Sequence, residues 1–172
     1  MDYFDVPLGK AYELLNPGGL VWLCTRAEDG RPDLAPVSWN CPLDYEPVSK
    51  VLLVVDTSHR SYENLVEAGE FVVALPTAAQ RALVDETGSV SGRDLDKYGH
   101  FGIGSRPAET VDALVPEGVA GWLECRLLRV VVEGTSGVVF GEVLKAKAKA
   151  DAWKERLHYV REGLWFAPGP AL

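Results

Sequence analysis

The chain has 172 residues, of which 47% are hydrophobic and 24% charged. These values are typical of one globular domain and exclude a disordered or fibrous chain, so residues 1–172 are expected to form a single domain. The net charge of −8 argues against non-specific binding to nucleic acid or to an anionic membrane. No apolar run reaches the roughly 18 residues of a membrane-spanning helix. The N-terminal MDYFDVPLGK lacks the layout of a signal peptide, so a cytoplasmic protein is expected.

Cysteine and histidine give no sign of a disulfide framework or a metal site. The cysteines are odd in number, far apart and without a CxxC pair: Cys24, Cys41 and Cys125. The histidines show no ligand spacing either: His59, His100 and His158. No metal is therefore expected.

The first half of the chain is dominated by strand patterns. VWLCTR (21–26) and DLAPVSW (33–39) flank the turn pair Asp29-Gly30 and predict a β-hairpin. VLLVVD (51–56) and EFVVAL (70–75) are continuous apolar runs, which predict strands buried on both faces. Between these two runs, SYENLVEAG (61–69) has helical spacing and ends at a glycine, and TAAQRALVDETG (77–88) predicts a second helix.

The second half is predicted to hold a long loop, a long hairpin and a final helix. Residues 89–116 are rich in glycine and proline and predict a loop with at most a short helix near 95–98. Residues 121–134 and 138–150 predict a hairpin, in which the alternation in KAKAKA places lysines on a wet face and alanines on the other. The amphipathic stretch 151–163 is compatible with a helix.

This order of elements predicts a mainly β fold, an antiparallel barrel with short helices packed outside. Apolar residues on the tail of an acidic chain, Trp165 and Phe166, further suggest a dimer interface.

The segment DTSHRSYEN (56–64) is the best candidate for an anion site. It leaves a strand and enters a helix, so backbone N–H groups are expected to face outward at the positive end of the helix dipole. Ser58 and Ser61 add hydroxyl groups, and Arg60 adds a fork that suits two phosphate oxygens. The alternative is that a serine merely caps the helix and Arg60 is a surface charge. No dinucleotide or P-loop glycine motif occurs.

A second candidate segment is APVSWNCPLDYEP (35–47), where a strand enters a proline-rich loop. Its polar residues, Ser38, Trp39, Asn40 and Cys41, suit the polar rim of a flat heterocycle, although asparagine and serine also cluster in ordinary turns. Cys41 as a nucleophile is weighed against burial as a small hydrophobic residue, and no histidine lies within its motif.

Four pieces, SWNCPLDYEP, HRSYEN, GEFVVALPT and SGRDLDK, occur in an order that resembles the flavin reductase-like, FMN-binding split-barrel family, also typified by flavoredoxin. The resemblance spans about residues 16–145. It implies a split β-barrel, a homodimer and FMN at the subunit boundary. It also implies that Ser38, Trp39, Asn40 and Cys41 line the isoalloxazine and ribityl chain, that Ser58, His59, Arg60 and Ser61 surround the phosphate, and that Lys97 lies near the flavin ring or a pyridine nucleotide.

The implied activity is that of an oxidoreductase that passes hydride or electrons from NAD(P)H through FMN to an acceptor. Three departures from the family pattern are Cys41 in place of Asn, Ala74 in place of Asn, and Gly134-Thr135-Ser136 in place of a Gly-Asp-His that helps to position nicotinamide in many reductases. The last departure keeps a second hypothesis open, an electron carrier that exchanges electrons with a redox partner protein. A cofactor-free barrel, or one with another ligand such as haem or pyridoxine phosphate, remains an alternative.

Overall fold

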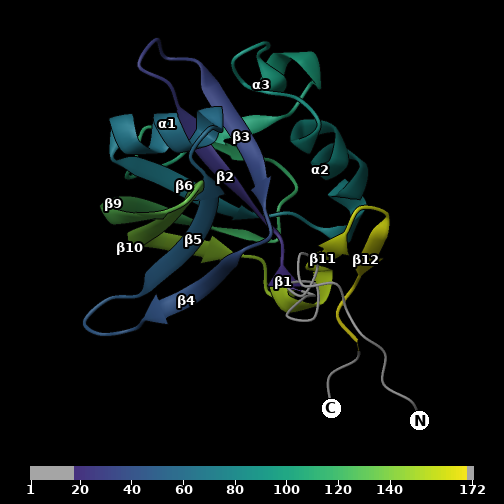
Figure 1. Ribbon diagram of the computed structural model, residues 1–172. Coiled ribbons are helices and arrows are strands. Elements are labelled where there is room, and N and C mark those ends of the chain that lie inside the picture. The colour runs from purple at the N-terminus through teal and green to yellow at the C-terminus, as the bar shows by residue number, and fades with distance from the viewer. Residues whose placement is uncertain (1–17, 170–172) are drawn as a thin grey trace, which may run out of the picture.

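The computed structural model describes residues 18–169, and strands predominate among them (Figure 1). MDYFDVPLGK, on which the signal-peptide expectation rests, and the last three residues of the tail lie outside the described residues. No helix among those described is both long and apolar enough to cross a membrane.

Seven strands form one antiparallel sheet in the order β3-β2-β6-β9-β10-β5-β4. Their bounds are Val21–Arg26 (β2), Pro32–Val37 (β3), Asn40–Asp44 (β4), Lys50–Asp56 (β5), Glu70–Leu75 (β6), Gly121–Glu133 (β9) and Ser136–Ala148 (β10). The edge strands β3 and β4 are consecutive in the chain, and between them the carbonyl of Trp39 accepts from the Val54 amide at 2.9 Å. Strand β3 also contacts β5, so the sheet rolls up on itself. The predicted antiparallel barrel is confirmed.

Strand β2 separates two apolar cores because its side chains are buried on both faces. Val21 and Leu23 pack inside the barrel with Phe71, whereas Trp22 and Cys24 pack on its outside, against the helices and the C-terminal part. Burial on both faces is likewise confirmed for EFVVAL.

For VLLVVD the prediction of burial on both faces is wrong. Leu53 and Val55 are buried inside the barrel, but Leu52 and Val54 are only half-buried. The reason is the position of β5 near the sheet edge, where its second face has no helix against it in the described part of the chain (Figure 1).

Both predicted helices are confirmed. Helix α1 (Arg60–Ala68) follows β5 and ends at Gly69, and α2 (Arg81–Gly88) follows a 3-10 turn, η2 (Ala78–Gln80). At the start of η2, the side chains of Thr77 and Gln80 form a capping box, which fixes where the chain turns into the helix.

The segment 89–116 is more ordered than predicted. It contains α3 (Lys97–His100) and a short hairpin of β7 (Ser105–Pro107) and β8 (Leu114–Pro116) that the sequence did not reveal. Tyr98 is buried and its hydroxyl donates to the carbonyl of Leu114 at 3.1 Å, while Val115 packs in the outer core. The segment therefore forms a wall of the molecule rather than a loose loop.

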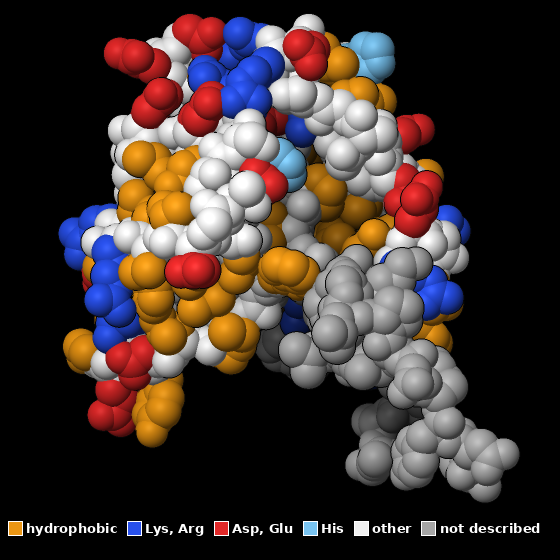
Figure 2. Space-filling view, viewed as in Figure 1, with side chains coloured by type: hydrophobic (Ala, Val, Ile, Leu, Met, Phe, Trp, Pro, Cys, Tyr) orange, Lys and Arg blue, Asp and Glu red, His pale blue; other side chains and the backbone are white. Residues whose placement is uncertain are grey.

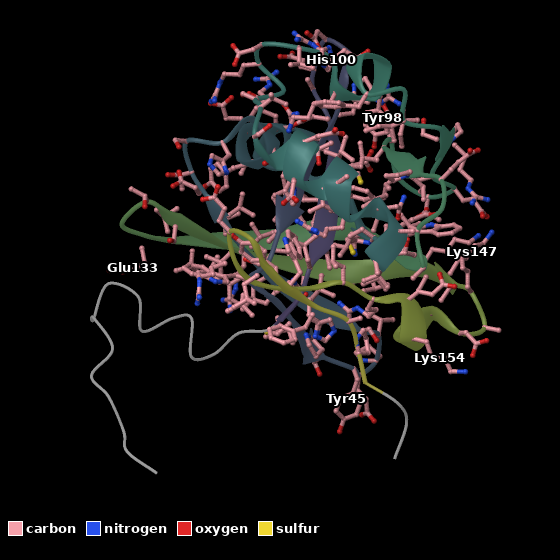
Figure 3. The ribbon with its side chains drawn as sticks, turned by 90° about the vertical axis from the view of Figure 1, so that its right-hand side faces the viewer. Tyr45, Tyr98, His100, Glu133, Lys147 and Lys154 are labelled. Carbon is pink, nitrogen blue, oxygen red and sulfur yellow. The ribbon has the colours of Figure 1, made fainter. Side chains whose placement is uncertain are left out.

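The long hairpin of β9 and β10 is confirmed and crosses the whole molecule, from near Glu133 at one end to Lys147 at the other (Figure 3). The alternation in KAKAKA is also present, but the lysines are paired rather than merely solvated. Lys145 and Lys147 both contact the carboxylate of Glu109, and Lys149 contacts Glu155 at 3.1 Å.

The predicted helix over 151–163 is wrong. Only one 3-10 turn forms, η3 (Ala152–Glu155), and it is followed by the antiparallel strands β11 (His158–Arg161) and β12 (Leu164–Phe166). Glu162-Gly163 connects them as a two-residue turn in which Gly163 has φ 73°, a conformation that favours glycine. Strand β1 (Gly18–Gly19) joins them to make a small sheet.

Candidate functional site

The turn between β5 and α1 is more tightly bonded than the sequence predicted. The carboxylate of Asp56 accepts from the amide and the hydroxyl of Ser58, at 2.8 and 2.7 Å, and these bonds lower the pKa of Asp56. The amides of Thr57 and His59 donate to backbone carbonyls at 2.8 and 3.1 Å. The prediction that these N–H groups face outward unpaired is therefore wrong for residues 57–59.

Ser61 in the first turn of α1 differs from its neighbours. It is 2% exposed, and its hydroxyl has no hydrogen-bond partner. At the second helical position, its amide also has no acceptor within the helix. Buried hydroxyl groups are normally paired, so this one is available to a ligand.

Ser61 lines a pocket of about 300 Å³, hereafter the first pocket. Its walls come from β3, the start of α1, the loop after α2 and α3, and they include Asp33, His59, Arg60, Arg93 and Lys97. The lining holds three cationic side chains against one carboxylate. In a chain with a net charge of −8, this concentration of positive charge favours an anion.

Two arginines on the wall share one carboxylate. Glu63 accepts from Arg60 at 3.2 Å and forms a second, short ion pair with Arg93. Hydrogen bonds from the two arginines hold the pKa of Glu63 below its ordinary value, and Arg93 has the larger effect. Arg93 also donates to the carbonyl of Ser58 at 2.8 Å, so it braces the turn that carries Arg60.

Lys97 lies deep in the wall. Its side chain is 3% exposed, and its ammonium group donates to the carbonyl of Leu34 at 2.8 Å and lies 3.2 Å from the Asp33 carboxylate. A side chain on Gly92 would collide with that carboxylate, because an added Cβ would lie 2.5 Å from it. The loop after α2 therefore closes tightly over the buried pair.

The four residues of segment 38–41 do not line one common pocket. Ser38 lines a second pocket. The Asn40 side chain instead donates to the carbonyls of Gly19 and Val37, at 2.7 and 3.2 Å, and so connects β4 to the chain before β2. Trp39 and Cys41 are exposed. Of the residues singled out from the sequence, the structure brings together His59, Arg60, Ser61 and Lys97.

The second pocket has a volume of about 670 Å³ and shares Pro36, Gly88 and Ser89 with the first. Together they form a trough between β3 and α2, visible as a hollow in Figure 2. Its far wall comes from the β11–β12 hairpin, including Trp165, which the sequence had assigned to a dimer interface. Pockets of this size range hold small-molecule ligands.

The sequence did not assign three important residues to the site. Arg93 stands in the quoted SGRDLDK, but an arginine in a loop gave no reason to prefer it over its neighbours. Asp33 was read only as part of a strand, and Trp165 only as a tail aromatic. Their roles depend on long-range packing, which no local spacing encodes.

The buried cysteines are separate from this site. Burial raises the pKa of the Cys24 and Cys125 thiols to about 12, so both stay protonated and unreactive at neutral pH.

Comparison with known proteins identifies the family of this chain. The sequence model of the family named "Flavin reductase like domain" matches residues 14–165. The chain belongs to this flavin reductase-like family. The resemblance found in the sequence is thus confirmed.

Relatives and solved structures agree with this assignment. The chain is 33% identical over 156 residues to the uncharacterized protein YddH of Escherichia coli (strain K12), covering 89% of this chain and 82% of that protein. It is similar in structure to the flavoredoxin of Desulfovibrio vulgaris (Miyazaki F), with a TM-score of 0.85, 20% identity and coverage of 100% and 96%. A second similar structure is the FMN-binding domain of a flavin reductases-like enzyme from Shewanella baltica OS155, with a TM-score of 0.76, 28% identity and coverage of 97% and 94%. The split-barrel fold is confirmed.

Proposed function

We propose that this protein is an FMN-binding oxidoreductase that passes hydride or electrons from NAD(P)H through bound FMN to an acceptor. The observation that carries the proposal is the buried, unpartnered Ser61 hydroxyl in a pocket lined by Arg60, Arg93 and Lys97. The proposal is also supported by the solved structures of this fold that are described as FMN-binding. NAD(P)H as donor implies a cytoplasmic location.

The first pocket suits the phosphate of FMN. That phosphate carries roughly −1.5 to −2 charge if it titrates like a phosphorylated side chain. Ser61 would donate its hydroxyl and its amide, while Arg60 and Arg93 would supply positive charge and N–H donors. Ser58 would act indirectly, because Asp56 already occupies its amide and hydroxyl. His59 would stand at the pocket wall.

The remainder of the flavin would extend along the trough past Pro36 and toward Ser38. Asp33 balances the charge of Lys97, so the pair would present a fixed dipole to the ligand rather than a free cation. Asn40 would hold β4 in place, whereas Trp39 and Cys41 are exposed and line neither pocket. When bound, FMN would supply the redox chemistry, and the protein would supply binding and orientation.

The first experiment is the visible spectrum of the purified protein. Bound FMN is expected either directly or after addition of FMN and removal of the excess. A protein that shows no flavin bands and takes up no FMN would remove the proposal.

A second candidate, an electron carrier without its own nicotinamide site, is favoured by Gly134-Thr135-Ser136. This turn connects β9 to β10 and lies beside the candidate phosphate turn, because the Thr57 amide donates to the carbonyl of Thr135 at 2.8 Å. It lacks the Asp and His of the Gly-Asp-His motif that the family resemblance implies at this turn. Anaerobic mixing of the FMN-loaded protein with NADH or NADPH separates the candidates: bleaching within seconds supports the reductase, and no bleaching supports the carrier.

The proposal includes a homodimer. The side of β5, β9 and β10 that faces away from the barrel interior is mostly apolar and is called here the outer apolar face; Figure 2 shows hydrophobic side chains gathered there. One charged residue, Arg129, also lies on it, with its guanidinium 4.4 Å from the centre of the Phe140 ring. Its members are Leu52, Val54, Leu128, Val131, Val138 and Phe140. Leu128 and Val131 are 45% and 49% exposed, which favours a second copy covering them. Phe166, at 50% exposure, remains compatible with the same role.

A further inference from the structure

The guanidinium of Arg93 is held at the first pocket by two acceptors on the opposite wall. Arg93 lies in the loop between α2 and α3, and its guanidinium donates to the carbonyl of Ser58 at 2.8 Å and to the carboxylate of Glu63. The side chain is 43% exposed and has many rotamers, so packing alone does not fix its direction. These two acceptors therefore determine where the guanidinium points.

Glu63 stands behind the two arginines rather than in the pocket. It lies in the first turn of α1 and does not line the first pocket, whereas Arg60 and Arg93 both do. Both oxygens of its carboxylate are engaged, Oε2 by Arg60 at 3.2 Å and Oε1 by Arg93. Two guanidinium groups repel each other, and a carboxylate between them offsets that repulsion. Glu63 can thus hold both arginines side by side and leave their remaining N–H donors for a ligand.

Glu63 acts on an anion in the first pocket in two opposite ways. Its negative charge repels the anion, so neutralising Glu63 would tighten binding if charge alone mattered. Its bonds to the arginines fix two cationic donors in advance, so removing these bonds would weaken binding. Water screens the repulsion because the Glu63 side chain is 37% exposed, whereas the bonds to the arginines are direct contacts. The positioning effect is therefore expected to exceed the repulsion.

We propose that Glu63 is a positioning residue of the phosphate site, whose carboxylate holds the Arg93 guanidinium beside that of Arg60 in the orientation that binds a phosphate monoester. Glu63 does not touch the ligand and acts through Arg93. The identity of the phosphate as that of FMN rests on the proposed function, whereas the hold of Glu63 on Arg93 does not.

The test compares Glu63→Gln with the unchanged protein in fluorescence titrations of FMN and of riboflavin. Glutamine keeps the size of Glu63, but it is neutral and its NH₂ group cannot accept from an arginine. The FMN dissociation constant should rise about 3- to 10-fold, less than for loss of a direct hydrogen bond to a charged group, because Arg60 and Ser61 remain at the phosphate. Riboflavin binding should stay within about twofold. An unchanged or tighter FMN complex overturns the proposal.

Two controls isolate the action through Arg93. Glu67→Gln removes the same charge one turn further along α1, from an exposed side chain that lines neither the first nor the second pocket, and it should not weaken FMN binding. Arg93→Ala should itself weaken FMN binding, and adding Glu63→Gln to it should cost at most about a further twofold, because the residue through which Glu63 acts is missing. A full 3- to 10-fold further loss in that background would overturn the proposal, because Glu63 would then act through another residue.

Measurements on the FMN-free protein separate this proposal from the proposed function. NMR of labelled arginine side chains reports how fast the Arg93 guanidinium rotates, and its signal is identified as the one lost in Arg93→Ala. Rotation should be faster in Glu63→Gln than in the unchanged protein or in Glu67→Gln. Exposed ion pairs contribute little stability, so the melting temperature of Glu63→Gln should change by less than about 4 °C.

The outcomes are distinguishable. Protein in which Glu63→Gln frees the Arg93 guanidinium but which takes up no FMN keeps the hold of Glu63 on Arg93 and refutes the flavin. Protein that binds FMN equally well with and without the Glu63 carboxylate keeps the flavin and refutes the positioning role. A large drop in melting temperature with equal losses for FMN and riboflavin would also overturn the proposal, because Glu63 would then only support the fold.

Discussion

Replacing Arg60 by alanine should weaken FMN binding much more than riboflavin binding. The Arg60 side chain is 24% exposed and lines the first pocket. A hydrogen bond to a charged group contributes about 1.5–3 kcal/mol, which corresponds to roughly 12- to 150-fold in affinity. Arg93 remains and compensates in part, so we expect the FMN dissociation constant to rise about 10- to 50-fold. Riboflavin lacks the phosphate, and its dissociation constant should stay within about twofold.

The assay is titration of each flavin with protein at fixed ionic strength, followed by quenching of flavin fluorescence. Lys154→Ala is the matched control, because it removes the same charge from a side chain that is 75% exposed and lines neither pocket. Its position at the periphery is visible in Figure 3. The control should bind both flavins like the unchanged protein.

Two results would contradict the proposed contact between Arg60 and the phosphate. An unchanged FMN dissociation constant in Arg60→Ala would mean that the phosphate binds elsewhere. An equal loss for FMN and riboflavin would mean that Arg60 supports the shape of the trough rather than the phosphate.

Three further changes test other parts of the structure. Ser61→Ala should weaken FMN binding. It should also raise the unfolding free energy of the FMN-free protein by about 1 kcal/mol, because it removes a buried hydroxyl without a partner. Denaturant unfolding with and without FMN measures both effects, and a loss of stability in the FMN-free state would contradict the prediction. Lys145 and Lys147 lower the pKa of Glu109 from 4.5 to about 2, so its contribution to stability is present above pH 4.5 and is lost as the pH falls toward 2. Glu109→Gln should therefore flatten the acid limb of a melting-temperature profile, and an unaltered limb would show that these ion pairs contribute nothing. Leu128→Glu on the outer apolar face should convert the dimer to a folded monomer, as measured by light scattering. Val66→Glu, on α1 and about equally exposed, should leave the dimer intact. A dimer in both variants would place the interface elsewhere.

Strands and helix ends were predictable because their signals are local. Asp29-Gly30 between two apolar runs is enough to predict the β2–β3 hairpin, and Gly69 is enough to end α1. The same local logic failed over 151–163, where helical spacing concealed the Glu162-Gly163 turn. There, burial of Val160 and pairing with β1 and β12 determine the conformation, and neither is encoded nearby.

The site was predictable only in part. The residue types in HRSYEN indicate an anion site, but the sequence does not reveal that Asp56 takes up the Ser58 donors and leaves Ser61 without a partner. Arg93 lies in a loop 35 residues after Ser58 and reaches this turn through its hydrogen bond to the Ser58 carbonyl. Pairing of Lys97 with Asp33 likewise depends on how α3 packs on β3.

A crystal structure of the FMN-loaded protein would show directly whether the first pocket holds the phosphate. We expect the phosphate in the first pocket, within hydrogen-bond distance of the Ser61 hydroxyl and in contact with Arg60 or Arg93. A phosphate bound outside this pocket, with the Ser61 hydroxyl still unpaired, would contradict it.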